Sequence, residues 1–173
     1  IKKNFIYDYI NIIPSLLTEK KIEELTVKDG YIKNFYTLQN NGFYKCKELN
    51  SSKKQLLKKY FKKSGFSALN FTDSRSVYQF YNLSYLWQHI QIALKNNIKK
   101  LNLATEPVSV KELYHFLNGT EFNNELPKEP YNYDIRTLYS ELFGGKNGYI
   151  FTKQQVKEQI KKFIEDENEV IDI

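Results

Sequence analysis

Apolar residues recur every three or four positions along most of this chain, the spacing of one face of an α-helix. Sequence signals for helix starts accompany them, because Ser109 and Thr152 each open a capping box, with Glu112 and Gln155 three residues later. The helices predicted in this way are residues 2–13, 15–26, 53–63, 82–96, 109–118, 134–142 and 152–165.

Shorter apolar or aromatic stretches predict strands at residues 66–71, 76–81 and 99–104. The stretch 31–50 contains a clear turn at Asn40-Asn41-Gly42, whose flanks fit either helix or strand. The pattern therefore predicts an α/β chain that is rich in helix and has a few short strands.

Two of the predicted helices are amphipathic. The helix over 53–63 has an apolar side opposite a run of lysines, which a solvated helix face explains fully. In the helix over 82–96, one row is expected to face a core, and its members are Leu83, Leu86, Trp87, Ile90 and Leu94. The acidic tail, 166–173, is expected to fray. Because no repeat or linker interrupts the chain, we expect residues 1–173 to form a single lobe.

The composition narrows the class of protein. Of 173 residues, 41% are hydrophobic and 27% charged, as in a folded soluble domain and unlike a disordered chain. No run of about 18 apolar residues occurs, so no membrane partner is expected. The single cysteine, Cys46, excludes an internal disulfide and fits the reducing cytoplasm.

Few residues of the chain suggest catalysis or metal binding. His89 and His115 lie inside predicted helices without a partner at metal-ligand spacing, so each is interpreted as structural. Cys46 has no identifiable base and is interpreted as an inert thiol. Gly144-Gly145 ends a predicted helix, whereas a phosphate-binding loop follows a strand and opens a helix.

The segment from Asp73 to Asn82 combines an arginine with a hydrogen-bonding strand. The planar fork of Arg75 matches the oxygens of a diphosphate, and Gln79 needs a polar partner if it is buried. A pair between Arg75 and Asp73 beside a core strand explains the same residues equally well.

The segment Ser74–Leu83 resembles the place in extended short-chain dehydrogenases where an arginine precedes a strand and a helix follows. Residues 101–110 look like the strand, loop and serine-capped helix of that family, and 133–150 are similar to its late helix and turn. With the segment 2–8 and the last helix, the resemblance covers 1–12 and about 66–165, and it leaves 14–65 as a variable insert.

The resemblance implies the C-terminal, substrate-binding portion of a Rossmann-type NAD-dependent epimerase/dehydratase that acts on a nucleotide-sugar. NAD or NADP would bind a missing N-terminal Rossmann domain, because this chain has neither a glycine-rich loop nor a Tyr-x-x-x-Lys pair. The chain alone is therefore expected to be inactive and to hold no cofactor. The residues implied in substrate binding are Arg75, Gln79, Asn4 and Arg136.

Two points leave alternatives open. Tyr81-Asn82 replaces the acidic residues that usually follow the arginine strand, so epimerase, dehydratase and reductase activities all stay open. With a net charge of +6, the chain also fits a stand-alone basic module for nucleic acid or protein, of which nucleic acid is the less favoured partner.

The chain begins at Ile1 and lacks methionine, from which we expect a processed or truncated product. Its exposed strand edges would favour a homodimer or aggregation.

Overall fold

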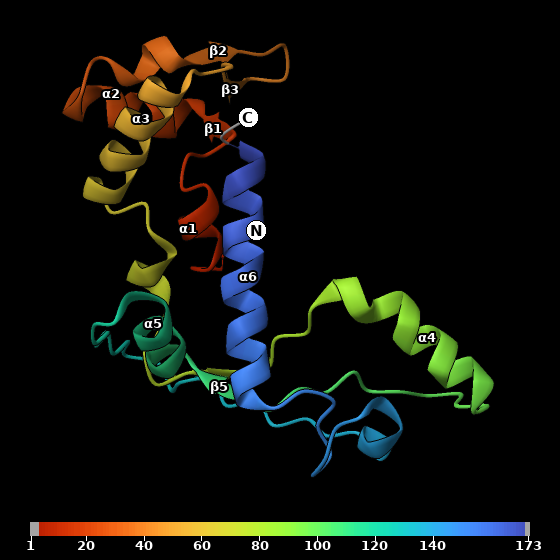
Figure 1. The fold of residues 1–173 in the computed structure, drawn as a ribbon. Helices are drawn as coiled ribbons and strands as arrows, with labels where there is room; N and C mark the ends of the chain where they lie inside the picture. Colours follow the sequence, from red (N-terminus) through yellow and green to blue (C-terminus); the bar gives the residue numbers. More distant parts are fainter. Residues whose placement is uncertain (1–3, 172–173) are drawn as a thin grey trace. The chain divides into compact units, whose positions relative to one another are not determined.

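The computed structural model describes residues 4–171 and shows a mixed α/β chain that is rich in helix and has a few short strands, as predicted (Figure 1). The described chain groups into two compact units, residues 4–67 and 68–171. The stretch expected to be a variable insert, 14–65, makes up most of the first unit. That both units act as a single substrate-binding lobe stays a prediction.

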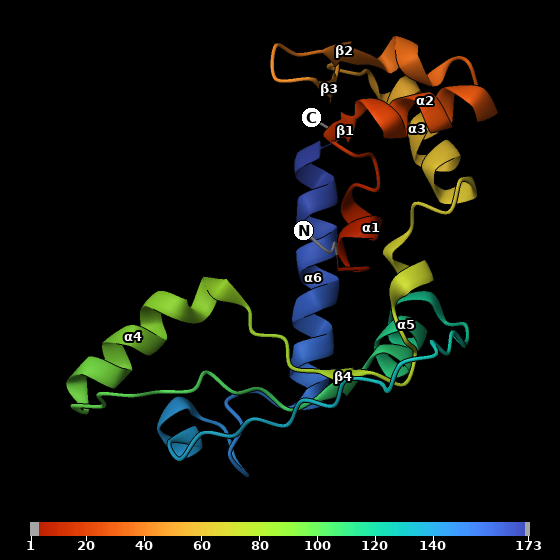
Figure 2. The same cartoon turned by 180° about the vertical axis from the view of Figure 1, so that it is seen from behind.

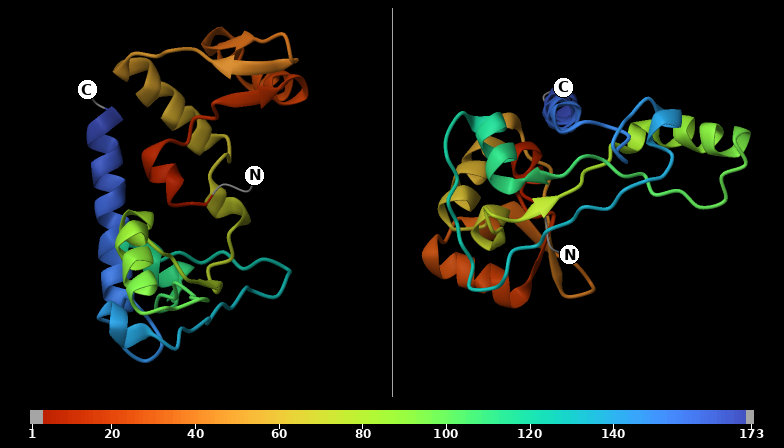
Figure 3. Two further views of the ribbon diagram at one scale, coloured as in Figure 1. Left: turned by 90° about the vertical axis from the view of Figure 1, so that its right-hand side faces the viewer. Right: turned by 90° about the horizontal axis from the view of Figure 1, so that it is seen from below.

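The first unit joins a three-stranded antiparallel sheet to helices. The central strand of the sheet is β3, with β1 and β2 on either side (Figure 3). The predicted turn is confirmed, because Gly42 adopts φ +78° and its N–H donates to the Gln39 carbonyl at 3.0 Å. The elements of this unit are α1 (Tyr7–Ile10), β1 (Leu16–Thr18), α2 (Glu19–Lys28), η1 (Ile32–Phe35), β2 (Tyr36–Leu38), β3 (Phe43–Cys46) and α3 (Ser51–Lys63).

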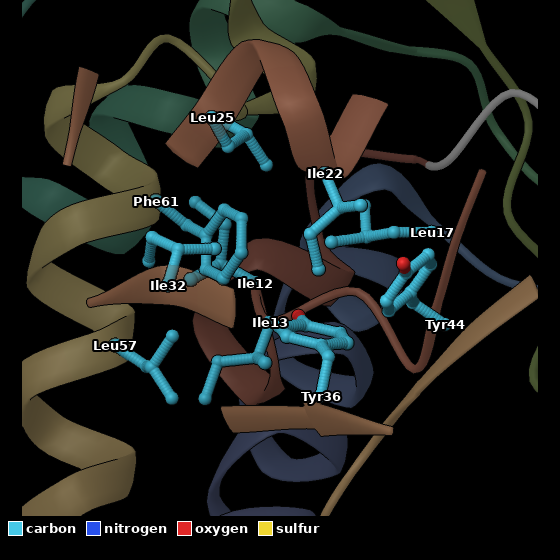
Figure 4. Close-up of a cluster of buried hydrophobic side chains, with 10 residues drawn as sticks. All are labelled: Ile12, Ile13, Leu17, Ile22, Leu25, Ile32, Tyr36, Tyr44, Leu57 and Phe61. Atoms are coloured by element: carbon cyan, nitrogen blue, oxygen red, sulfur yellow. The ribbon is translucent and has the colours of Figure 1, made fainter. Parts of the chain in front are cut away.

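A hydrophobic cluster holds the first unit together (Figure 4). The predicted lysine-rich helix is confirmed as α3, and its apolar side brings Leu57 and Phe61 into the cluster with no exposed surface. The Tyr36 hydroxyl keeps a polar partner by donating to the Pro14 carbonyl at 2.9 Å. The buried members are Ile12, Ile13, Leu17, Ile22, Leu25, Ile32, Tyr36, Tyr44, Leu57 and Phe61.

The second unit is built around short extended segments. Strand β4 pairs with β5 in antiparallel register, and the segment at 131–133 runs along the other edge of β4. There the Val77 N–H donates to the Tyr131 carbonyl at 2.7 Å, and the Tyr133 N–H donates to the Val77 carbonyl at 3.1 Å. The elements are η2 (Ala68–Phe71), β4 (Val77–Tyr78), η3 (Leu83–Tyr85), α4 (Leu86–Lys95), β5 (Val108–Ser109), α5 (Val110–Asn118), η4 (Ser140–Phe143) and α6 (Lys153–Ile171).

Both predicted capping boxes are present. The Ser109 hydroxyl accepts from the Glu112 N–H, and the Glu112 carboxylate accepts from the Ser109 N–H at 3.1 Å, so α5 begins where the sequence indicated. Thr152 and Gln155 make the same exchange before α6. That helix continues to Ile171, so residues 166–171 are helical where a frayed tail was expected, and residues 172 and 173 lie outside the described residues.

Several predicted elements are wrong. Residues 66–71 contain the 3-10 turn η2 instead of a strand, since the Asn124 amide donates to the carbonyl of Leu69 in this turn and to that of Thr72 just after it. Residues 99–104 form no strand ladder with any described segment. The first helix is short, because α1 covers only Tyr7–Ile10, and residues 1–3 lie outside the described residues.

The predicted helix at 134–142 is also replaced, by an extended segment followed by η4. Gln79 explains the change, because its side-chain oxygen accepts from the Ile135 N–H at 2.8 Å and its amide donates to the Ile135 carbonyl at 2.7 Å. A backbone whose N–H and carbonyl are both bound to a neighbouring side chain cannot use them in helix hydrogen bonds.

Candidate functional site

Arg75, the residue predicted to bind a diphosphate, lies just before β4 and is held by carboxylates. Its Nε and Nη2 donate to the two oxygens of Asp73, at 3.0 and 2.8 Å. Its Nη1 donates to Glu125 at 3.1 Å, and Nη2 also reaches the Leu126 carbonyl at 3.1 Å. Since 41% of its side chain is exposed, the guanidinium is oriented by Asp73 but still open to solvent.

Asp73 is the anchor of this arrangement, and only 5% of it is exposed. Its carboxylate also accepts from the backbone N–H of Arg75 and of Leu126, both at 2.9 Å. The hydrogen bonds from the Arg75 side chain, followed by those from the two backbone N–H groups, hold the pKa of Asp73 well below its usual range. Asp73 therefore stays ionised and ties the turn before β4 to the loop at 124–126.

Gln79 is a connector between three extended segments. Its amide nitrogen donates to the carbonyls of Thr105 and Ile135, at 2.5 and 2.7 Å, and its oxygen accepts from the Ile135 N–H. The expected polar partner of Gln79 is therefore backbone. All three polar contacts are made within the chain, which assigns Gln79 a positioning role in this structure.

Arg136 lies one residue beyond the contact with Gln79, so the fold brings these two predicted residues into the same neighbourhood. Its guanidinium pairs with Asp134 at 3.1 Å and lies over the Tyr149 ring, 5.0 Å from the ring centroid. The Tyr149 hydroxyl also donates to Asp134. The Arg136 side chain is 59% exposed. Like the guanidinium of Arg75, its guanidinium is ion-paired with a carboxylate on one edge and accessible to solvent on another.

Asn4 belongs to the first unit, and its contacts are local. The side-chain oxygen accepts from the Ile6 N–H at 3.1 Å, and the backbone carbonyl accepts from the Tyr7 N–H at 3.1 Å. These bonds start the short helix α1. For Asn4, as for the other three residues, a contact with substrate stays a prediction.

His89, interpreted from the sequence as a structural residue inside a helix, is buried in the second unit. His89 is 4% exposed, and its Nδ1 shares a hydrogen bond of 2.8 Å with the Tyr81 hydroxyl. Rings of Tyr85, Phe143 and Phe151 surround it, with centroids 6.0, 5.1 and 5.7 Å away. Burial lowers the pKa of His89, so the neutral imidazole is favoured. The sequence pattern of residues 78–82 did not predict the hydrogen bond between Tyr81 and His89.

Helix α4 presents its apolar row to solvent, contrary to the prediction that this row faces a core. Exposure is 68% for Trp87, 38% for Ile90, 70% for Leu94 and 73% for Leu83, which lies in η3 just before α4, whereas Leu86 of the predicted row is half-buried. Figures 1 and 2 show no other described α-helix running alongside α4. The side of α4 that packs in this unit is instead the one that carries His89.

Other kinds of site find little support in the described part of the chain. No group of three or more His, Cys, Asp or Glu side chains between residues 4 and 171 is placed to hold a metal ion. A shallow hollow lies beside α2, and none of the four predicted substrate residues contributes to it; it is lined by Ile22, Glu23, Thr26, Val27 and Lys33. Within the described residues no helix has the length and apolar character needed to cross a membrane.

Comparisons of the chain with models of protein families, with curated proteins and with solved structures returned no significant match.

Proposed function

We propose that this chain is the substrate-binding region of an NAD(P)-dependent nucleotide-sugar epimerase or dehydratase of the extended short-chain dehydrogenase class, and that it is inactive without a cofactor-binding Rossmann domain. The observation that carries the proposal is the uncovered apolar row of α4. The sequence resemblance places a helix at this position, next to the arginine strand, and implies a neighbouring domain that the chain does not itself contain.

The spacing of the α4 row suits a docking surface. Trp87, Ile90 and Leu94 follow one another at intervals of three and four residues and form one stripe along α4, and Leu83 in the turn η3 precedes this stripe by four residues. Single exposed apolar residues are ordinary, but a contiguous stripe of four large ones is typical of a covered surface. A cofactor-binding domain packed on α4 would remove this stripe from water.

The segment at 99–106 supports the same partner. It joins no ladder among the described residues; its backbone partners are in residues 150–151, with the Ile150 N–H donating to the Ala104 carbonyl at 2.8 Å and the Glu106 N–H donating to the Phe151 carbonyl at 2.9 Å. A strand predicted from sequence that lacks its neighbour is expected where the rest of a sheet belongs to another domain. Addition of that domain would complete the strand.

Substrate recognition is assigned to Arg75. Asp73 fixes the plane of the guanidinium, whereas Glu125, 68% exposed, is free to give way to a more highly charged ligand. A diphosphate can therefore take the Nη1 edge without disturbing the Asp73 pair. Arg136 offers a second exposed guanidinium, and Gln79 keeps the extended segments beside them in register.

No step is derived through NAD or NADP. Each glycine with a positive φ in the described chain lies in a turn or at a helix end, and the sequence has no strand followed by a glycine-rich loop and a helix, so these residues do not form a dinucleotide cradle. In the proposed enzyme, hydride chemistry and the catalytic tyrosine and lysine belong to the other domain.

The experiment that tests the proposal begins with the reading frame upstream of the codon for Ile1. The proposal predicts a strand, glycine-rich loop and helix, and a Tyr-x-x-x-Lys pair, within about 150 preceding residues, the size of an ordinary domain. A frame that starts within a few codons of Ile1 would contradict it.

With the product of that frame in hand, binding of uridine, guanosine and thymidine diphosphate sugars is measured by calorimetry. Arg75→Ala is expected to lower the affinity for the nucleotide-sugar at least about tenfold. Glu125→Gln, which removes only the competing carboxylate, is expected to keep or improve that affinity. Equal affinity in the Arg75 variant and the unaltered protein would remove Arg75 from the site.

A further inference from the structure

Positive charge is distributed very unevenly between the two units. Residues 4–67 contain 12 lysines and six acidic residues, whereas residues 68–171 contain 12 lysines or arginines and 13 acidic residues. The first unit is thus strongly basic, and the second is close to neutral. The proposed nucleotide-sugar function does not account for this, because both arginines assigned to the substrate lie in the second unit.

Helix α3 carries half of the lysines of the first unit. Leu57 and Phe61 point into the hydrophobic cluster (Figure 4), and Tyr60 packs against its edge. The six lysines of α3, which we call the lysine face, are Lys53, Lys54, Lys58, Lys59, Lys62 and Lys63; Lys54 and Lys58 are half-buried, and the other four are exposed.

The lysine face is not neutralised within the chain. Among the side chains that the structure describes, residues 4–168, no carboxylate lies within ion-pair distance of any of its six ammonium groups. In the second unit, by contrast, six of the 12 basic side chains form ion pairs, among them Arg75, Lys111 and Lys153. Helix-end electrostatics explains only part of the pattern, because it favours lysine in the last turn, at Lys62 and Lys63.

We propose that the lysine face of α3 holds the protein on an anionic lipid surface. This revises the expectation that no membrane is a partner, which depended on the lack of an apolar span, because attachment to a surface needs no span. A cluster of four to eight lysines on an amphipathic helix is typical of attraction to acidic headgroups. Since Leu57 and Phe61 are buried in the core, the helix cannot turn its apolar side into the bilayer. The association is therefore electrostatic, reversible and sensitive to salt. Leu56, 59% exposed, adds one apolar contact at the edge of the face.

Features of the same face argue against nucleic acid as the ligand. The first unit has no arginine, so it lacks the planar fork that reads guanine and grips phosphate in two places. The aromatic residues of α3 are Tyr60 and Phe61; Phe61 is buried, and the Tyr60 hydroxyl donates to the Leu25 carbonyl at 3.2 Å, so neither offers a free ring for stacking bases. A cluster of lysines without arginine or a stacking ring suits the anionic headgroups of a lipid surface better than nucleic acid.

Sedimentation of the full chain with lipid vesicles tests the proposal. Vesicles of phosphatidylcholine containing one-third phosphatidylglycerol are compared with vesicles of phosphatidylcholine alone, at roughly 50 mM and roughly 500 mM salt. The protein is expected to bind the anionic vesicles at low salt and to leave them at high salt. A variant with Lys58, Lys59, Lys62 and Lys63 changed to Gln is expected to bind more than about a hundredfold more weakly, at about fivefold for each lysine.

The matched control removes the same charge elsewhere. It changes Lys95, Lys99, Lys100 and Lys128 in the second unit to Gln, none of which has an ion pair with a described carboxylate, and it is expected to keep most of the binding. A double variant, Lys58→Gln with Lys59→Gln, spares the last turn of α3 and keeps the test valid if the fourfold variant does not fold.

Three results would overturn the proposal. One is equal sedimentation with anionic and neutral vesicles. Another is an equal loss of binding in the control variant, because net charge alone would then be responsible. The third is tight, salt-sensitive binding to a duplex or single-stranded oligonucleotide without binding to vesicles. Since none of these measurements involves nucleotide-sugars, failure here leaves the proposed enzyme function to its own test.

Discussion

The carboxylate of Asp73 and the guanidinium of Arg75 are joined by two parallel hydrogen bonds, from Nε at 3.0 Å and from Nη2 at 2.8 Å. One partner is buried and the other is partly exposed. The buried carboxylate of Asp73 therefore fixes the plane of the guanidinium, and Arg75 presents its remaining edge to solvent.

We expect Asp73→Ala to lower the free energy of unfolding by about 1–3 kcal/mol, because two buried backbone N–H groups and the arginine lose their acceptor. Urea unfolding followed by circular dichroism measures the change. The control is Glu125→Gln, at a side chain 68% exposed, which should stay within about 0.5 kcal/mol of the unaltered protein. An Asp73 variant as stable as this control would mean that the carboxylate does not organise the turn.

Gln79→Ala is expected to release the segment around Ile135. Its backbone N–H and carbonyl would both lose their side-chain partner, which costs about 1–3 kcal/mol if they stay unpaired. Hydrogen exchange measures this directly, since the Ile135 amide should exchange faster in the variant. Gln154→Ala is the control, because Gln154 bonds only to Glu158 on the exposed side of α6. Unchanged exchange at Ile135 would contradict the connector role.

The stability of the protein should depend on pH through His89. Burial lowers the pKa of this histidine in the folded state, so the unfolded chain takes up a proton first as the pH falls. The contribution of His89 is complete above about pH 6.5 and declines below it, toward the lowered pKa of the folded state. Thermal unfolding between about pH 5 and pH 8 should show this decline.

His89→Phe is expected to remove most of that pH dependence, since a phenyl ring fits among the rings of Tyr85, Phe143 and Phe151 without a proton to gain. The matched change His115→Gln, at a side chain 57% exposed, is expected to keep it. If the His89 variant retained the full decline below pH 6.5, another group would be responsible.

The exposed row of α4 should cause the chain to self-associate. Leu94→Gln combined with Leu83→Gln is expected to reduce association, measured by light scattering, and to change the stability of the chain by less than about 0.5 kcal/mol, because both side chains are at least 70% exposed. Leu113→Ala in α5 is the contrasting variant. Its side chain has no exposed surface, so it should cost about 2–5 kcal/mol. A strong loss of stability in the Leu83/Leu94 variant would show that the row is covered within the chain.

Local signals in the sequence predicted helix starts well. Ser109 with Glu112, and Thr152 with Gln155, open their helices where predicted, because a capping box satisfies backbone donors within four residues and needs no distant partner. The lysine-rich helix was also predicted, and its cap is Asn50, whose side chain accepts from the Lys53 N–H at 3.0 Å.

Features that depend on distant residues were not predictable from local patterns. Gln79 reaches Ile135 across 56 positions, and Asn124 reaches Leu69 across 55, and these contacts replace an expected helix and an expected strand. In α4 the periodicity was identified, but a pattern cannot say which partner covers an apolar face. For the candidate site, the sequence named Arg75 and its alternative partner Asp73, and the structure shows that pair formed.

The single tryptophan, Trp87, lies in the middle of the α4 row and reports directly on whether another domain covers it. The measurement is quenching of its fluorescence by acrylamide, in this chain and in the product of the complete reading frame, with a Trp87→Phe variant of the longer product to identify its signal. The account predicts strong quenching in this chain, where Trp87 is 68% exposed, and protection in the longer product. Equally strong quenching in both would contradict the claim that α4 is the docking surface for a cofactor-binding domain.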